Sequence, residues 1–194
     1  MAHLRREDLW SLEDYAQRRP AFRAEAIAHK RLRTVHIGPN VTLLFEDTTT
    51  IRYQIQEMLR IERTFEAAGI QDELDAYNPL IPDGANFKAT QLIEYPEELE
   101  RKLRLQALKG IERATWVRVD GHPKVYAIAD EDLARENETK TSSVHFLRFE
   151  LDAPMRRDLK AGHALGMGID HPNYQHILEE VAPETQTSLA ADLD

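Results

Sequence analysis

Three polar side chains in the stretch IRYQIQEMLRIER have the types and spacing needed to hold an anion. Arg52, Gln56 and Arg60 recur at intervals of four residues, so on a helix they form a single row, with Glu57 adjacent to it. Guanidinium and amide N–H groups in fixed positions bind carboxylate or phosphate oxygens. The alternative is a solvated helix flank, in which each ion pair contributes at most ~0.5 kcal/mol.

The eight histidines suggest a second kind of site, a mononuclear metal centre. His171 follows Asp170 in the segment DHPNYQH, and His145 lies in a segment with strand-like alternation. Imidazole and carboxylate groups are ligands of iron, manganese and zinc. Neither His-Glu-x-x-His nor Glu-x-x-His occurs, so the site would be assembled from distant segments. The competing interpretation makes Asp-His-Pro a turn or helix N-cap with no ligand role.

A third candidate is the segment LDAYNPLIPDGANFK (74–88), which is rich in turn-forming residues and is expected to be an irregular loop. Long loops often carry binding residues. The side chains capable of polar contacts here are Asn78, Asp83, Asn86 and Lys88. Because Asn-Pro and Asp-Gly are turn formers in their own right, a purely structural role is the alternative.

Hydrophobic periodicity predicts the helices that would position these groups. We expect one helix over 8–32, interrupted at Pro20, and a second over 47–69, closed by Gly69. The buried stripe of the second helix is expected to comprise Ile51, Ile55, Met58 or Leu59, and Phe65. Further helices are expected at 96–110, 153–162 and 173–181.

Segments rich in β-branched and aromatic residues, separated by turn formers, predict antiparallel strands. They are 34–37 and 41–45 around Gly-Pro-Asn, 87–95, 115–119 and 124–129 around Asp-Gly-His-Pro, 143–151, and 164–170. Helices set between hairpin strands argue for an α+β fold, with a mainly antiparallel sheet and one pair of layers around one core. Neither GxGxxG nor GxxxxGK[ST] is present, which disfavours a nucleotide-binding doubly wound fold.

Length and composition favour a single domain over residues 1–194. We divide it into an N-terminal helical segment (8–32), an α+β core (33–181) and an acidic C-terminal tail (182–194), which we expect to be loosely docked. The net charge of −9 disfavours nucleic acid as a partner.

Cysteine is absent from the sequence, which excludes disulfides, a cysteine nucleophile and any iron–sulfur or zinc site built on thiolates. The apolar runs are too short for a membrane-spanning helix, and the first ten residues lack the apolar core of a signal peptide. We therefore expect a cytoplasmic protein without a membrane partner.

Five segments are familiar as they stand: RTVHIGPNVTLLFED, TIRYQIQEMLRIER, LDAYNPLIPDGANFKAT, VYAIADEDLARENETKTSSVHFLRFEL and GIDHPNY. They resemble a bacterial family classed as a conserved protein of unknown function, from about Leu9 to Tyr174. Genes of that family often lie beside rubrerythrin-like and iron–sulfur oxidoreductase genes, so the resemblance implies a link to peroxide handling or electron transfer. It supplies no catalytic residue. The resembling motifs contain Arg52, Gln56, Glu57, Arg60, Asn78, Asp83, Glu136, His145, Asp170 and His171.

Three hypotheses follow for the function. The favoured one is an accessory protein that docks on a redox partner, which would carry the metal and the electrons and would bind an exposed apolar patch. The second is an enzyme or sensor with a mononuclear metal, and the third is a binding module for a small anionic metabolite. The sequence specifies neither a reaction nor a cofactor, and it is compatible with a homodimer.

Overall fold

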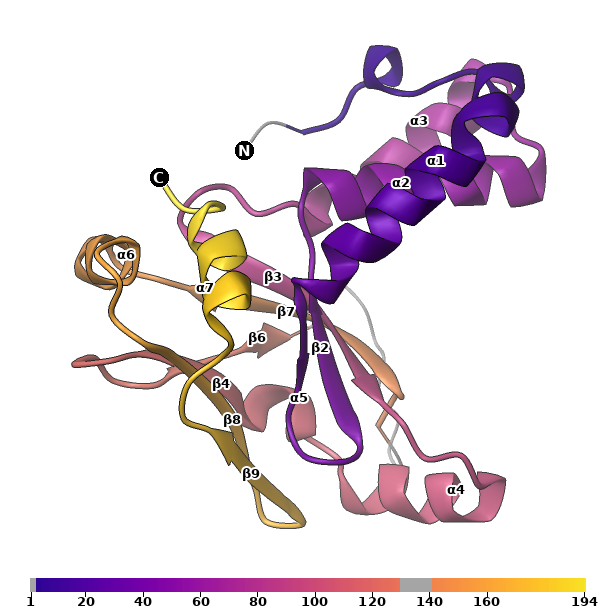
Figure 1. The fold of residues 1–194 in the computed structure, drawn as a ribbon. Helices are drawn as coiled ribbons and strands as arrows, with labels where there is room; N and C mark the ends of the chain where they lie inside the picture. Colours follow the sequence, from indigo (N-terminus) through magenta and orange to yellow (C-terminus); the bar gives the residue numbers. More distant parts are fainter. Residues whose placement is uncertain (1–2, 130–140) are drawn as a thin grey trace.

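The computed structural model describes residues 3–129 and 141–194, in which a helical unit stands on a pair of packed β-sheets (Figure 1). The helices are η1 (Arg6–Asp8), α1 (Leu12–Arg31), α2 (Thr48–Glu62), α3 (Ala67–Tyr77), η2 (Asn78–Leu80), α4 (Glu98–Ala107), α5 (Ile111–Ala114), α6 (Ala153–Lys160) and α7 (Pro183–Ala190). The strands are β1 (Thr34–His36), β2 (Val41–Phe45), β3 (Asn86–Ile93), β4 (Thr115–Val119), β5 (Val125–Tyr126), β6 (Ile128–Ala129), β7 (Val144–Glu150), β8 (Leu165–His171) and β9 (Tyr174–Leu178).

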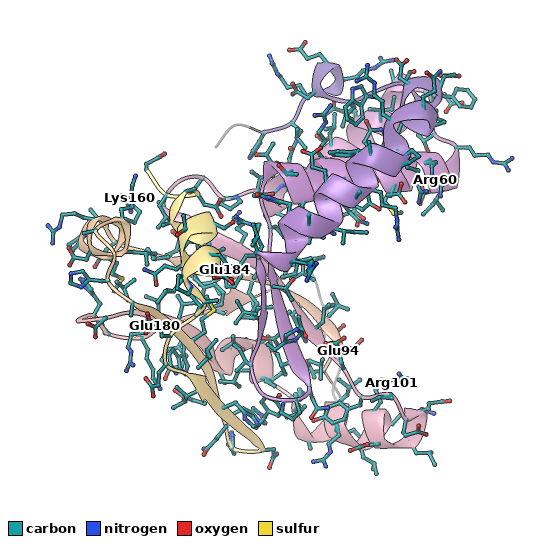
Figure 2. All side chains as sticks on the ribbon, viewed as in Figure 1. Arg60, Glu94, Arg101, Lys160, Glu180 and Glu184 are labelled. Atoms are coloured by element: carbon teal, nitrogen blue, oxygen red, sulfur yellow. The ribbon has the colours of Figure 1, made fainter. Side chains whose placement is uncertain are left out.

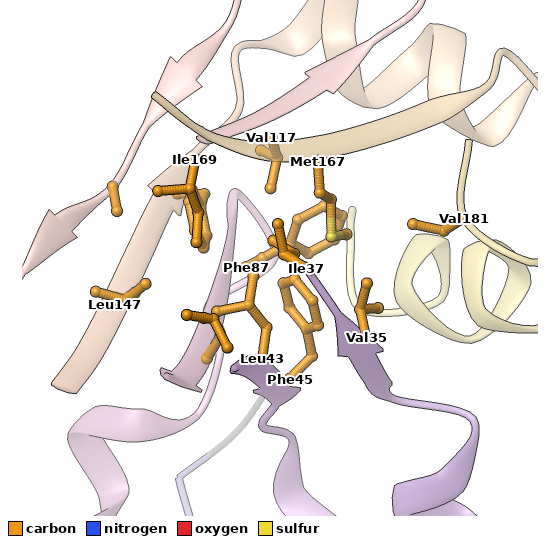
Figure 3. Packing of buried hydrophobic residues seen from close by; sticks show 14 of the residues in the cluster. Val35, Ile37, Leu43, Phe45, Phe87, Val117, Leu147, Met167, Ile169 and Val181 are labelled. Atoms are coloured by element: carbon orange, nitrogen blue, oxygen red, sulfur yellow. The ribbon is translucent and has the colours of Figure 1, made fainter. Parts of the chain in front are cut away.

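The described strands form two antiparallel sheets, which confirms the predicted α+β class. One sheet has the order β1-β2-β3-β7-β6, and the other has the order β5-β4-β8-β9. Alternate residues of each strand point into the space between the sheets. There Phe45 and Phe87 of the first sheet pack with Val117 and Met167 of the second (Figure 3). This inter-sheet layer is the main hydrophobic core.

The helical unit has its own small core. Ile51, Ile55 and Leu59 of α2 pack against Leu74 of α3 and against Leu4 of the N-terminal segment. The spacing of the three α2 residues is that of one helix face, as the periodicity predicted.

Helix α1 passes through Pro20 without interruption, contrary to our expectation. Proline removes one backbone hydrogen bond, which would otherwise run to the carbonyl four residues earlier. Both Pro20 and Ala16 are exposed, so the freed carbonyl lies on the side that water reaches. The cost is thereby limited, and packing of the opposite face of α1 on α2 maintains the helix.

The second expected helix is in fact two helices. Helix α2 ends at Arg63, which adopts a left-handed conformation with φ 56° and donates its backbone N–H to the carbonyl of Leu59. Gly69 lies inside α3, where an added Cβ would come within 2.5 Å of Thr64. This glycine therefore permits a close approach of the chain and does not terminate a helix. Phe65, placed by us in the buried stripe, lies in the connection and is 68% exposed.

Residues 173–181, expected to be a helix, contain β9, which pairs with β8 in the register Ile169↔His176. The segment has apolar residues at helical spacing, but the neighbouring strand supplies backbone partners for an extended chain. Tyr174 points to the core side and Ile177 is 57% exposed, as strand alternation requires.

The C-terminal residues are packed tightly against the body, although we expected a loosely docked tail. Leu189 and Leu193 enter the main core. Asp192 binds Arg33, whose side chain is only 1% exposed, through both terminal guanidinium nitrogens. Arg33 also donates from Nε to the carbonyl of Phe45 at 3.0 Å.

Replacing Asp192 should test this buried ion pair. Asp192→Ala leaves the guanidinium of Arg33 buried without its carboxylate, so we expect the free energy of unfolding to fall by about 3–5 kcal/mol. Glu184→Ala on the exposed side of α7 is the matched control and should change stability by less than about 0.5 kcal/mol. Urea denaturation followed by circular dichroism measures both. Equal small losses would show that the pair does not stabilise the docked tail.

Candidate functional site

The polar row of α2 faces the N-terminal segment of the same chain. Gln56, fully buried, accepts a hydrogen bond from the backbone N–H of Trp10 at 2.7 Å, and its Nε2 lies 3.5 Å from the carbonyl of the same residue. The guanidinium carbon of Arg52 lies 4.1 Å from the centre of the Trp10 ring, within cation–π distance. Two members of the expected anion-binding row therefore hold one tryptophan.

Glu57 joins α1 to α2. Its carboxylate accepts hydrogen bonds from the Tyr15 hydroxyl at 2.7 Å and from Nε and Nη2 of Arg19 at 2.7 and 2.9 Å. The hydrogen bonds from Arg19, above all, lower the pKa of Glu57 from 4.5 to about 2. Arg60, 3.7 Å from this carboxylate and 44% exposed, lies at the surface of the helical unit (Figure 2).

A surface groove opens between the N-terminal segment, the end of α2 and the start of α3. We call it the Trp10 groove; its volume is about 340 Å³. Its apolar lining consists of Leu9, Trp10, Leu12, Leu59, Phe65 and Ile70, and its charged lining residues are Arg6 and Glu13. Phe65 is 68% exposed, so one large apolar side chain of the lining reaches the solvent at this groove.

Local sequence features position the residues that line the groove. The sequence patterns did not single out Trp10, and they placed Phe65 in the buried stripe of a helix. Ser11 caps α1 by accepting a hydrogen bond from the backbone N–H of Asp14 at 3.1 Å, which places Trp10 just outside the helix. The left-handed turn at Arg63 directs Phe65 away from the helical core. A tryptophan beside an N-cap serine was the available signal for the first of these residues.

The structure does not bring together the three candidate metal ligands. Asp170 and His171 are neighbours in β8, and successive strand residues point to opposite faces of a sheet. Asp170 accepts hydrogen bonds from Lys124 and Tyr126, each at 2.7 Å, and these lie at the open face. Across residues 3–129 and 141–194, no group of three or more His, Asp or Glu side chains is arranged to hold a metal ion.

The two candidate histidines both have partners within the protein. Nε2 of His171 lies 3.1 Å from the carbonyl of Lys109, and its Nδ1 accepts the backbone N–H of Asn173 at 3.2 Å. His145 lies between the sheets, 2.8 Å from the Thr141 hydroxyl and 3.8 Å from Glu112. Glu112 is 2% exposed and was not singled out by our sequence analysis. The contacts of His171 join β8 to the turn after α4, and those of His145 join β7 to α5.

The segment 74–88, expected to be an irregular loop, contains the end of α3, η2 and the start of β3, and its candidate residues bind the segment itself and its neighbours. The Asn78 side chain makes two hydrogen bonds to the backbone of Leu4, at 2.8 and 2.9 Å. Asp83 accepts the N–H of Ala85 at 2.9 Å, which lowers the pKa of its carboxyl group. Asn86 donates to Glu150 at 3.2 Å, and Lys88 donates to the carbonyl of Pro79. Glu136 lies outside the described residues.

Fold and groove together define an α+β protein that presents a surface groove with several large apolar lining residues on a helical unit. The chain belongs to the family described as protein of unknown function (DUF3501), whose model matches residues 3–193. It is similar to a crystal structure titled as a novel protein of unknown function from Burkholderia pseudomallei K96243. The two are 54% identical over 100% of both chains, with a TM-score of 0.94. No curated protein matches the chain.

These comparisons confirm the sequence resemblance as far as a bacterial family of unknown function is concerned. Within the described part of the chain, none of the helices has the length and apolar character needed to cross a membrane.

The lowered pKa of Glu57 predicts acid sensitivity. A carboxylate whose pKa is lowered on folding stabilises the protein above its unfolded pKa, and this contribution is lost as the pH falls from 4.5 toward about 2. We expect Glu57→Gln to lower the free energy of unfolding at pH 7 by about 1–3 kcal/mol, and the difference from wild type to shrink below pH 4.5. Urea denaturation at both pH values measures this. Glu62→Gln, exposed on the same helix, is the control, and a pH-independent loss would contradict the assignment.

The Gln56 contacts predict how Trp10 is held. In a Trp116→Phe background Trp10 is the sole tryptophan, and Gln56→Met removes both hydrogen bonds at similar side-chain volume. We expect the N-terminal segment to loosen, with about a twofold rise in acrylamide quenching of Trp10 fluorescence, because an unpaired buried backbone group favours exposure to water. Gln54→Met is the control. Equal quenching in the two variants would show that Gln56 does not hold the tryptophan.

Proposed function

We propose that the protein is an accessory module that docks on a redox or oxidative-stress partner through the Trp10 groove. The observation that carries this proposal is the 68% exposure of Phe65, a large apolar side chain that lines the Trp10 groove. Full burial of an apolar side chain of this size against a partner would contribute about 1.5–3 kcal/mol of favourable free energy. The helical unit also stands out from the sheets, which makes this end accessible (Figure 1).

The chemistry of the groove favours a protein over a small polar ligand. Small-molecule sites combine apolar walls with a few polar groups that converge on the ligand. In the Trp10 groove, the Ser11 hydroxyl already caps α1, and the charged lining residues are one cation, Arg6, and one anion, Glu13. The groove thus combines two aromatic side chains, Trp10 and Phe65, with one charge of each sign, and aromatic and charged residues of this kind are common in protein-binding hot spots.

The occupant that we propose is an apolar helix face of a rubrerythrin-like or iron–sulfur protein. The identity of this partner rests on the gene neighbourhood that the family resemblance implies. Its mode of binding rests on the groove, because a concavity lined by several large apolar side chains accepts anchor side chains from one face of a helix. Arg6 and Glu13 would then pair with charges that flank such a face.

Calorimetry with purified proteins tests the proposal. The probes are the rubrerythrin-like protein and the iron–sulfur oxidoreductase of the same organism, each titrated into the full chain. We expect one of them to bind, and Phe65→Ser to weaken binding by at least about thirtyfold, since truncating an anchor residue costs ~2 kcal/mol or more. Leu99→Ser, an exposed leucine on the distant α4, is the control and should leave the affinity unchanged. Binding of neither probe, or equal affinity of both variants, overturns the proposal.

The two alternatives have weaker support. The anion-binding proposal keeps Arg60 as an exposed cation, but Arg52 and Gln56 already contact Trp10. The metal-binding proposal has His145 on β7, and Asp170 and His171 on opposite faces of β8. Elemental analysis of protein purified from its own host without chelators tests the metal-binding alternative. Stoichiometric iron, manganese or zinc would favour a metal site over docking alone.

A further inference from the structure

Helix α4 presents two leucines to solvent. Leu99 and Leu103 are 78% and 67% exposed, whereas Leu105 and Leu108 on the other side are buried in the main core. Residues four apart lie one turn above each other, so the two exposed leucines form a short apolar stripe. The helix lies at the opposite end of the molecule from α1, α2 and α3 (Figure 1). This stripe is therefore separate from the Trp10 groove.

Charged residues flank the stripe in a regular order. On one flank Glu98 forms an ion pair with Lys102 at 2.9 Å, and on the other Glu100 pairs with Arg104 at 3.4 Å. Both pairs have the spacing i, i+4, and in both the acid precedes the base by one turn. The helix thus has an acidic first half and a basic second half along each side of the leucines.

We propose that this face of α4 binds the same face of a second copy, with the two helices antiparallel about a two-fold axis. An antiparallel arrangement reverses the order of charges, so each flank's acid faces the partner's base, Glu98 opposite Lys102 and Glu100 opposite Arg104. A parallel arrangement would instead place acid beside acid. Leu99 and Leu103 of each copy then cover those of the other.

A second copy fits this surface because the surface is complementary to itself. A two-fold interface is made of the same patch on both subunits, and it must therefore carry both signs of charge in a reversible order. The four charges and two leucines of α4 meet that condition. With two leucines from each subunit, the contact is smaller than a standard interface of about 1,600 Å². We therefore expect a weak dimer that is populated only at high protein concentration.

Sedimentation equilibrium over a range of protein concentrations tests the apolar part. The wild-type chain should pass from monomer to dimer as the concentration rises. The double variant Leu99→Ser with Leu103→Ser should raise the dissociation constant more than about tenfold. Ile61→Ser with Phe65→Ser, which removes a comparable exposed pair from the other end, is the control and should dimerise as wild type does. A monomeric wild type, or unchanged dimerisation of the leucine variant, overturns the proposal.

A charge exchange tests the orientation. Glu98→Lys with Glu100→Lys makes both flanks basic, and Lys102→Glu with Arg104→Glu makes both flanks acidic. Each variant alone should stay monomeric, because its helices repel each other, and an equal mixture should form a heterodimer. Circular dichroism of each variant confirms that it is folded. Dimerisation of either charge variant alone, or no dimer in the mixture, overturns the antiparallel arrangement.

Discussion

The buried guanidinium of Arg33 joins the helical unit to the sheets. It follows α1 directly, donates to the carbonyls of Phe45 and Glu46 at the end of β2, and binds Asp192 after α7. Asp47, the N-cap of α2, lies 3.5 Å from its Nε. A guanidinium has five N–H donors in a planar fork, whereas a lysine ammonium has three donors on one nitrogen and would not reach all of these acceptors. The position of the helices on the sheets, and so the accessibility of the Trp10 groove, depends on this contact.

The polar residues of α2 carry out a related task inside the helical unit. Gln56 and Glu57 bind Trp10, Tyr15 and Arg19, so the segment before α1 and the first turns of α1 are held against α2. By holding Trp10 and the start of α1 in place, these contacts fix the positions of residues that line the Trp10 groove. Buried polar groups with good partners are specific in geometry, whereas apolar contacts alone allow sliding. The shape of the Trp10 groove therefore depends on polar side chains that do not line the groove themselves.

Much of the fold could be predicted because its signals are local. Alternation and turn residues predicted β1 to β4, β7 and β8, and helical spacing predicted the face of α2 that contains Ile51 and Ile55. Residues 124–129, expected to be one strand, contain β5 and β6, which belong to different sheets. Errors arose where a tertiary partner overrode the local pattern. The segment around His176 is a strand because β8 supplies hydrogen bonds. Gly69 was expected to end a helix, but it lies within α3, where the absence of a side chain allows Thr64 to approach closely. The groove itself was missed, since its walls come from three separate segments.

The sequence by itself determined the fold class, through periodicity and turn chemistry, and the residue types from which any site must be built. The absence of cysteine excluded sites built on thiolates, and the net charge of −9 disfavoured nucleic acid as a partner. Only the tertiary structure decided what the row of Arg52, Gln56 and Arg60 contacts. Spacing places side chains on one face of a helix, but whether that face meets water, a ligand or another segment depends on packing between residues far apart in the chain. In this protein, residues more than forty positions away in sequence, Trp10 among them, meet that face.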